Sequence, residues 1–393
     1  MKSNITMHPS VFNFGPASAL RTLHRALRRT VPSESGLVLD KTKQISPASV
    51  DAFANDRRPG AAMQAASSWP YVNGRTPVIL PREKLVEKIT ASDPGQFVEG
   101  SVTNRAGTRS YKLYIPSCYR GQPLPLVVML HGCKQDPDDF ATGTRMNAVA
   151  EDKQCFVLYP AQSGTANSPK CWSWFSAADQ ERERGEPSLI ADITREIMRT
   201  YHVNESMVYV AGLSAGGAMA VIMATTYPDI FAAAAIHSGM PYNAARSLFS
   251  ALSAMKNGPR RRQYEQSGPT AGGTTPAVPM IVFHGDADTV VHPTNGEQVI
   301  REAVATLATG TTGEESDPVA VTSVIERSRP ERRSYTRTVY HDESGQSMAE
   351  QWVIHGSGHA WSGGCSDGSY TDPNGPDATN EMMRFFYERT PAR

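Results

Sequence analysis

Residues 212–216, Gly-Leu-Ser-Ala-Gly, place a serine between two glycines in a pattern that can perform nucleophilic chemistry. The pattern follows the apolar run 207–211 and leads into the apolar segment 215–226, so it lies where a strand would turn into a helix. Glycines at both ends permit the sharp turn that exposes a serine hydroxyl at the end of a strand. A five-residue pattern recurs by chance, but this context favours Ser214 as a nucleophile for acyl transfer.

A serine hydroxyl is a weak nucleophile at neutral pH, so it needs a base, and the base needs an acid to orient it. Two apolar runs further along the chain each end in suitable side chains. The first leads to Asp286 and Asp288, and the second leads to His355 and His359. This order of serine, acid and histidine is the one expected when the serine follows a strand in this way.

Position on the two loops decides between these candidates. Asp288 lies further out than Asp286, where it can reach a histidine, so we predict Asp288 as the acid; Asp286 is the alternative and suits bracing of the turn. His355 still belongs to its strand, whereas His359 lies beyond it between a glycine and an alanine. We therefore predict His359 as the general base.

An acyl-transfer site also needs donors for the negative charge that develops on the carbonyl oxygen. The backbone amide of Ala215, directly after the serine, is one predicted donor. The second should come from the loop 131–135, which follows the apolar run 126–130, and the amide of Cys133 is the candidate. Each such donor typically lowers the barrier by about 3 kcal/mol.

Aromatic side chains commonly line pockets for small acyl groups. Trp172 and Trp361 lie in segments expected near the same edge of the sheet as the serine. We predict that both contact the substrate. Packing in the core is the alternative for each, because it is the usual role of tryptophan.

Cysteine and histidine spacing gives little support for a metal site. The five cysteines include no Cys-x-x-Cys pair and no histidine spacing suited to zinc. His284 and His292 lie near the two acids and could be grouped with them as ligands, but the pattern is a poor one. We expect neither a metal nor a cofactor. Because five is an odd number, at least one thiol must stay unpaired within the chain.

The elements that would position these residues are unbroken apolar runs separated by helical segments. Continuous rather than alternating apolarity is typical of strands that are covered on both faces, as in a parallel sheet. Residues 189–201 and 215–226 have the composition and spacing of helices that pack on such a sheet. Together with the serine motif, this alternation predicts an α/β-hydrolase fold, with a central, mostly parallel sheet and helices on both faces. The apolar runs are 126–130, 155–159, 207–211, 231–236, 280–283 and 352–354.

The chain divides into an extension and a catalytic domain. Residues 1–95 are rich in Ser, Ala, Pro, Asn and Arg without a sustained period, so we predict an irregular, flexible extension before a catalytic domain at 96–393. Within the extension, residues 20–29 are basic with spaced leucines and could form a short amphipathic helix. Two polar stretches, 257–278 and 309–334, are predicted surface insertions, although loops of this length can also act as lids.

Charge and hydropathy exclude several classes of protein. The 39 basic and 39 acidic residues cancel, which disfavours a nucleic-acid binder. No stretch approaches the ~20 consecutive apolar residues of a membrane span, and the N-terminus has no continuous apolar region of the signal-peptide type. We therefore expect a soluble, cytoplasmic protein.

With these residues assembled, the chain from about residue 97 to about residue 390 resembles the poly(3-hydroxybutyrate) depolymerase family of esterases, which also includes feruloyl and acetylxylan esterases. The resemblance implies the triad Ser214, Asp288 and His359, and hydrolysis of esters of 3-hydroxyacids through an acyl-enzyme. Because secreted members can carry disulfides, it also allows a bridge between Cys133 and Cys171. The motifs that carry it are Leu-His-Gly-Cys at 130–133, Cys-Trp at 171–172, Gly-Leu-Ser-Ala-Gly-Gly-Ala-Met at 212–219, Gly-His-Ala-Trp-Ser-Gly-Gly at 358–364 and Tyr-Thr-Asp-Pro-Asn-Gly-Pro-Asp-Ala at 370–378.

The substrate is less sharply defined than the chemistry. Secreted polymer-degrading members generally have a signal peptide and a polymer-binding domain after the catalytic one, which this sequence does not display. We therefore expect an enzyme inside the cell that acts on amorphous 3-hydroxyalkanoate polymer or its oligomers, with residues 1–95 as a candidate contact to polymer granules. A feruloyl or acetylxylan esterase is the alternative, and a non-catalytic binding module on the same fold is an alternative of another class. The oligomeric state stays open.

Overall fold

A computed structural model of the chain describes residues 95–164, 170–258, 278–310, 320–326, 331–342 and 345–389. The predicted N-terminal extension, including the basic segment 20–29, lies outside these residues except for Gly95, as does most of the stretch 257–278. None of the described helices is both long and apolar enough to cross a membrane.

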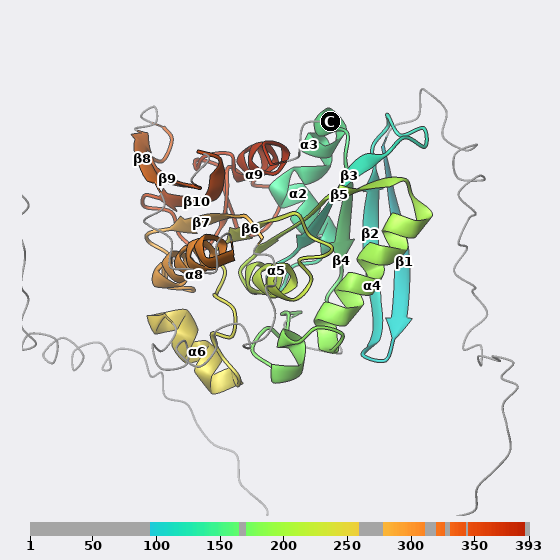
Figure 1. Ribbon diagram of the computed structural model, residues 1–393, viewed down its shortest axis with the longest axis horizontal. Coiled ribbons are helices and arrows are strands. Elements are labelled where there is room, and N and C mark those ends of the chain that lie inside the picture. The colour runs from blue at the N-terminus through green and yellow to red at the C-terminus, as the bar shows by residue number, and fades with distance from the viewer. Residues whose placement is uncertain are drawn as a thin grey trace, which may run out of the picture. The chain divides into compact units, whose positions relative to one another are not determined.

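A twisted sheet of ten strands crosses the described part of the chain in the order β1-β2-β4-β3-β5-β6-β7-β10-β9-β8 (Figure 1). The six strands from β4 to β10 in this order run parallel, and antiparallel pairs flank them on both sides. The predicted α/β fold with a mostly parallel sheet is confirmed. The strands are β1 (Gln96–Asn104), β2 (Gly107–Ile115), β3 (Leu124–Leu130), β4 (Phe156–Pro160), β5 (Val203–Leu213), β6 (Ala233–His237), β7 (Met280–Gly285), β8 (Ala320–Glu326), β9 (Tyr335–His341) and β10 (Ser347–Ile354), with a separate short pair of β11 (Trp361–Ser362) and β12 (Thr371–Asp372).

Helices cover both faces of this sheet, with α2, α3 and α9 on one side and α4, α5 and α8 on the other (Figure 1). The pattern within β3 shows why the strands are apolar throughout. Val127 and Met129 pack into one core, and Val128 and Leu130 pack into the core on the opposite face. The helices are α2 (Pro137–Thr144), α3 (Met146–Lys153), α4 (Gly185–Thr200), α5 (Ala215–Thr226), α6 (Leu248–Asn257), α8 (Thr294–Gly310) and α9 (Ala378–Tyr387), with the short 3-10 helix η1 (Ala177–Gln180).

One predicted insertion contains a strand. Within the polar stretch 309–334, residues Ala320–Glu326 form β8 and pair antiparallel with β9 at the edge of the sheet. Residues 321–324 are exposed, as expected of a surface insertion, but the segment forms an edge strand, which the sequence analysis did not predict. The segment Ala-Val-Thr-Ser-Val-Ile-Glu is rich in β-branched residues, which favour an extended edge strand even within a polar surrounding.

We expect the carboxyl of Glu302 on α8 to make stability depend on pH. Burial raises its pKa to about 8, and a hydrogen bond from Gln298 at 3.1 Å lowers it by less. Above the ordinary carboxyl pKa of about 4.3, the folded chain holds a proton that the unfolded chain releases, so stability falls as the pH rises from there to about 8. Glu302→Gln should be more stable than the wild type at about pH 9, with a shallower decline in Tm.

The measurement is a set of thermal unfolding curves at several pH values between about 5 and 9. Glu297→Gln, at an exposed position of the same helix, is the matched control and should keep the wild-type pH profile. Superimposable profiles for Glu302→Gln and the wild type would show that Glu302 does not titrate in this range.

Candidate active site

Ser214 lies at the turn between β5 and α5 in a backbone conformation with φ 58° and ψ −118°. Such a conformation is strained for a residue with a side chain and is the one that the glycine-flanked serine turn requires. The glycines on either side have steric reasons to be glycine. A Cβ at Gly212 would collide with the backbone of Gly216, and a Cβ at Gly216 would collide with the carbonyl oxygen of Leu130. The predicted turn is therefore present, and Ser214 stands at the carboxyl end of β5.

The structure brings Asp288 and His359 together from the ends of β7 and β10. Oδ2 of Asp288 lies 2.7 Å from Nδ1 of His359, and both side chains are shielded from solvent. The other carboxylate oxygen accepts the backbone N–H groups of Val290 and Val291 at 2.9 Å each. These two bonds fix the carboxylate, so it can hold the imidazole in one orientation with Nε2 pointing away from it.

The carboxyl of Asp288 stays ionised in this setting. Burial by itself would raise its pKa, but hydrogen bonds from His284 and His359 outweigh burial and hold the pKa well below its ordinary value. Nε2 of His284 lies 3.4 Å from the carboxylate and 2.8 Å from the carbonyl oxygen of Val291. An ionised acid at this place stabilises the imidazolium that forms when a base accepts a proton.

Asp286, the alternative acid, pairs with a different histidine and has a structural role. Its carboxylate pairs with Nδ1 of His355 at 2.9 Å and accepts the backbone N–H of Gly356 at 2.6 Å. Both side chains are partly open to solvent. Asp286 therefore braces the turn after β10, which is the role that sequence reasoning left open for it. Among the described residues, no three histidine, cysteine or acidic side chains are grouped as metal ligands would be.

His237, at the end of β6, connects the serine turn with the histidine loop. Its carbonyl oxygen accepts the backbone N–H of Ser214 at 2.9 Å, and its ring Nε2 accepts the backbone N–H of Ser362 at 3.0 Å. Burial, together with the nearby His284 and His359, lowers the pKa of His237 to about 3, so the ring is neutral and can accept this bond. The sequence analysis did not identify His237. The pattern that could have found it is a histidine at the end of an apolar strand, which His284 and His355 also show.

The two predicted oxyanion donors lie on neighbouring segments. Ala215 is the first residue of α5, where a backbone N–H has no acceptor within its own helix. Cys133 belongs to the loop after β3, where Oε1 of Gln135 accepts the N–H of Gly132 at 2.9 Å. The absence of a side chain at Gly216 lets the start of α5 lie against the carbonyl oxygens of Leu130 and His131, where this loop begins. Their role as donors stays a prediction, and the loop contacts are compatible with it.

A disulfide joins Cys133 to Cys171, across 38 residues of chain. It ties the loop of the candidate oxyanion amide to the segment that carries Trp172. The indole of Trp172 adds a second link, because its Nε1–H donates to the carbonyl oxygen of His131 at 3.0 Å. The disulfide and this hydrogen bond therefore fix the loop after β3 at Cys133 and at His131.

Both candidate substrate tryptophans are buried in packing contacts. Trp172 is 0% exposed, and Trp361 is 2% exposed. Trp361 stacks on His237 with ring centroids 5.2 Å apart and donates to Oγ1 of Thr379 at 3.0 Å. These contacts are those of core residues that support the site. Their predicted contact with substrate stays a prediction.

Removal of the disulfide should affect both activity and stability. We expect the double variant Cys133→Ala/Cys171→Ala to lose about tenfold in kcat on a short-chain nitrophenyl ester, because a displaced oxyanion donor weakens transition-state binding. The free energy of unfolding should fall by about 2–4 kcal/mol. Cys365→Ala, which removes an unpaired cysteine, is the control and should change neither quantity appreciably. An unchanged kcat in the double variant would argue against the Cys133 amide as a donor.

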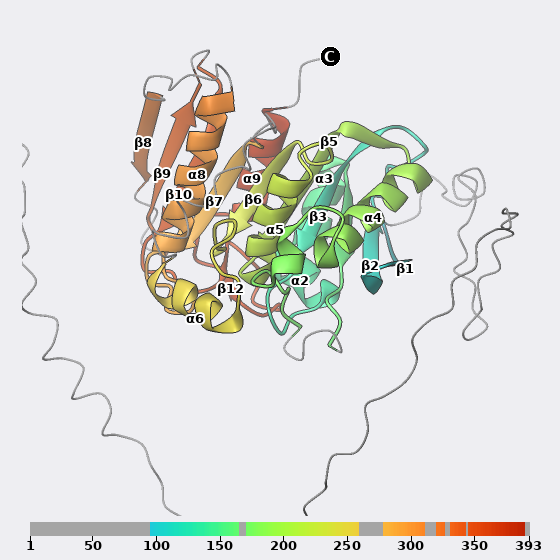
Figure 2. The same cartoon turned by 60° about the horizontal axis from the view of Figure 1, so that its bottom comes forward.

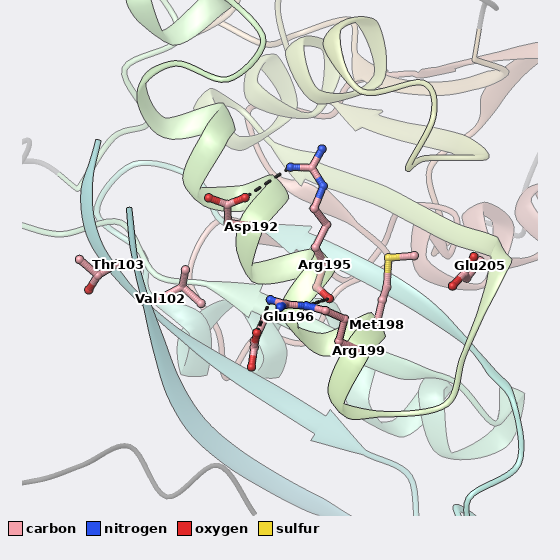
Figure 3. A pocket seen from close by; sticks show the side chains of 8 residues that line it. All are labelled: Val102, Thr103, Asp192, Arg195, Glu196, Met198, Arg199 and Glu205. Carbon is pink, nitrogen blue, oxygen red and sulfur yellow. Dashed lines mark hydrogen bonds and ion pairs between the residues drawn. The ribbon is translucent and has the colours of Figure 1, made fainter. Parts of the chain in front are cut away.

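A cavity of about 710 Å³ lies between the β1 strand, helix α4 and the start of β5, away from these residues (Figure 3). Charged side chains dominate its lining. Asp192 pairs with Arg195 at 3.3 Å, and Glu196 pairs with Arg199, so the charges largely satisfy one another. None of the candidate catalytic residues lines this cavity, and it plays no part in the chemistry considered below.

Comparison with known proteins identifies the family of the chain. A family model described as esterase PHB depolymerase matches residues 109–315, more than half of the 393 residues. Poly(3-hydroxyalkanoate) depolymerase C of Paucimonas lemoignei is 32% identical over 264 residues, which cover 65% of this chain and 59% of that protein. Feruloyl esterase B of Neurospora crassa is 30% identical over 240 residues, which cover 57% of this chain and 80% of that protein.

A solved structure shares the fold. The acetyl xylan esterase from Aspergillus awamori superposes with a TM-score of 0.55 at 22% identity, covering 74% of this chain and 99% of that one. The chain spans about three fifths of the length of the depolymerase that it matches. The match to the family model over more than half of its length shows that this chain belongs to the esterase PHB depolymerase family.

Proposed function

We propose that this chain is a serine ester hydrolase, with Ser214 as nucleophile, His359 as general base and Asp288 as the orienting acid. The observation that carries the proposal is the 2.7 Å contact between Asp288 and Nδ1 of His359, made by a carboxylate with no exposed side-chain surface. The strained serine turn lies at the same carboxyl edge of the sheet, two strands away from β7 in the sheet order. A buried carboxylate whose pKa is strongly lowered by a histidine is typical of functional sites, and its burial distinguishes this pair from the partly exposed Asp286–His355 pair.

The proposed reaction proceeds in two halves. Nε2 of His359 accepts the hydroxyl proton of Ser214 as the oxygen attacks the ester carbonyl, and the backbone amides of Ala215 and Cys133 bind the oxyanion. The intermediate collapses, the bond to the leaving alcohol breaks, and the imidazolium returns the proton to that alcohol. Water then attacks the acyl-enzyme with the same base, which releases the acid and restores Ser214. Asp288 stays ionised throughout and stabilises each imidazolium.

For the substrate, we propose esters of 3-hydroxyalkanoates, as polymer or as oligomers. The similarity to a protein named poly(3-hydroxyalkanoate) depolymerase C supports this choice, and similarity to feruloyl esterase B supports feruloyl or acetyl esters as the second candidate. A cytoplasmic location belongs to the same proposal, but the disulfide between Cys133 and Cys171 favours an oxidising compartment. Contact of residues 1–95 with polymer granules also stays a proposal, because these residues lie outside the described part of the chain, except Gly95.

The test is clearing of an amorphous poly(3-hydroxybutyrate) suspension by the wild type and by Ser214→Ala, with a short-chain nitrophenyl ester assayed in the same preparations. Clearing by the wild type alone would establish depolymerase activity through Ser214. If the short ester were cleaved and the suspension stayed turbid, the polymer would be excluded as substrate and the esterase mechanism kept. Feruloyl and acetyl esters of xylan would then be assayed. Cleavage of none of these esters would overturn the proposal.

A further inference from the structure

The loop that carries the candidate base is fixed two residues before it, at Ser357. This residue is 1% exposed, and its backbone carbonyl oxygen accepts the N–H of Ala287 at 3.1 Å. Ala287 directly precedes the candidate acid Asp288. The Ser357 hydroxyl donates to Oδ2 of Asp372 at 2.6 Å. Because Ser357 lies near His359 along the chain and bonds the neighbour of Asp288, its position helps to set the separation of acid and base.

Asp372 lies on β12, within the segment 370–378, which contains none of the proposed catalytic residues. It is 7% exposed, and its carboxylate accepts from three groups. Oδ2 accepts the hydroxyl of Ser357 and Nε of Arg333, and Oδ1 accepts the backbone N–H of Asn374 at 3.2 Å. Figure 2 shows β12 at the lower end of the sheet, beneath β6 and β7. The carboxylate therefore supports the loop of the candidate base from outside the triad.

Arg333 holds both Asp372 and the loop of the candidate base. Its guanidinium pairs with Asp372 through Nε and donates from Nη1 to the carbonyl oxygen of Gly356 at 2.6 Å. Its backbone N–H donates to the carbonyl oxygen of Asn374 at 2.8 Å, which ties it to the turn after β12. The N–H of Gly356 donates to Asp286, also at 2.6 Å. The backbone at Gly356, which has a φ of 71°, is therefore held by two charged side chains.

We propose that Asp372 is a positioning residue for the candidate base. Through the hydroxyl of Ser357, it fixes the loop at the place where His359 meets Asp288. Arg333 orients the carboxylate for this bond. The proposal rests on the ester hydrolase function proposed above and adds a residue that acts through the loop rather than on the substrate. Misplacement of a catalytic group by about 1 Å can lower a rate by as much as about a hundredfold, so support of the loop affects the rate without taking part in the chemistry.

Asp372 also has a local structural role, which a side-chain substitution leaves in place. Its backbone carbonyl oxygen accepts the N–H of Gly363 at 2.8 Å, where β11 pairs with β12. The side chain of asparagine has one acceptor oxygen, whereas the carboxylate has two. That single oxygen cannot replace both carboxylate oxygens toward Ser357, Arg333 and Asn374. Asp372→Asn therefore weakens the support of the loop with almost no change in size.

The test compares Asp372→Asn with the wild type on a short-chain nitrophenyl ester, with kcat expressed per active site from the end point of fluorophosphonate labelling. We expect kcat to fall about tenfold with KM within about twofold, because the base is displaced while the nucleophile is unchanged. The acidic limb of kcat/KM should move to lower pH by at least about half a unit, because the imidazolium of His359 loses part of its contact with Asp288. His237 and His284 also face this pair and are retained in every variant.

Ser357→Ala tests the same contact from its other side, because it removes the hydroxyl and leaves Asp372 paired with Arg333. It should produce the same two changes. The double variant with Asp372→Asn should lie within about twofold of the slower single variant, because both substitutions break one contact. Asp377→Asn is the matched control, with the same chemical change in the same segment. Asp377 caps α9, where asparagine caps as well as aspartate, so this variant should keep the wild-type kcat and pH profile.

Thermal unfolding shows whether each variant keeps its fold, and Ser357→Ala decides by the same readouts if Asp372→Asn does not fold. Wild-type kcat per active site or an unmoved acidic limb in Asp372→Asn would overturn the inference, because Asp372 would then serve the fold alone. Equal changes in Asp377→Asn would overturn it as well, as would additive losses in the double variant. Absence of ester hydrolysis by the wild type itself is a different outcome, which would overturn the proposed hydrolase function and the inference with it.

Discussion

Ser214→Ala should abolish hydrolysis of a short-chain nitrophenyl ester, with kcat lowered by about four to six orders of magnitude. The variant retains the turn and both predicted oxyanion amides but has no oxygen to attack the carbonyl, so only binding and oxyanion stabilisation remain. The measurement is the initial rate of nitrophenol release with substrate at saturation. Labelling by a fluorophosphonate should disappear in the same variant, because that reagent reacts with an activated serine.

The matched control is Ser206→Ala, a serine exposed to solvent on β5 but near the opposite end of the strand from Ser214. It should keep wild-type activity and labelling. Thermal unfolding of both variants shows whether either substitution disturbs the fold. Activity of Ser214→Ala within about tenfold of the wild type, well short of the loss that a nucleophile implies, would place the nucleophile on another residue.

Asp288→Asn should lower kcat by about four orders of magnitude while leaving the fold intact. The amide oxygen can still accept the N–H groups of Val290 and Val291, so the loop keeps its support. The amide nitrogen, however, would point a donor at Nδ1 of His359 and favour the tautomer that carries its proton on Nε2. That tautomer cannot accept the proton of Ser214. The measurement is kcat on the short ester as a function of pH.

Asp286→Asn is the control that tests the choice between the two acids. Its amide can still accept from Gly356 and donate to His355, so the brace after β10 survives in a weaker form. We expect kcat within about fivefold of the wild type, because loss of part of a solvent-exposed contact is a small effect. A large loss in Asp286→Asn with a small one in Asp288→Asn would reverse the assignment.

The sequence by itself determined the structural features that depend only on residues close together along the chain, such as the serine turn and the strands covered on both faces. The serine turn follows from two glycines between an apolar strand and an apolar helix, and the structure has that turn at Ser214. Continuous apolar runs required strands covered on both faces, and β3 sends alternate side chains into two cores. These properties are set within a few residues of chain, so sequence alone could predict them.

Only the tertiary structure decided which residues from distant segments of the chain contact one another. The distance along the chain from Asp288 to His359 is 71 residues, and the contact exists because β10 lies beside β7 in the sheet. The link from His237 to Ser362 across 125 residues was invisible for the same reason, as nothing in either local pattern identifies the other. Sequence reasoning placed Asp288 and His359 on loops of the right edge but could not measure their separation.

Burial and exposure were likewise decided by packing. Trp172 and Trp361 were predicted to contact the substrate, with core packing as the alternative, and only the tertiary structure shows that both rings pack within its two cores. On α6, Leu248, Phe249 and Leu252 are exposed, whereas Ala251 and Ala254 are buried. The sequence determined which side chains were available for the chemistry and for contact with substrate. The order of the strands and the fit of helices on the sheet decided which of those side chains meet one another and which meet the solvent, because these contacts join residues far apart along the chain.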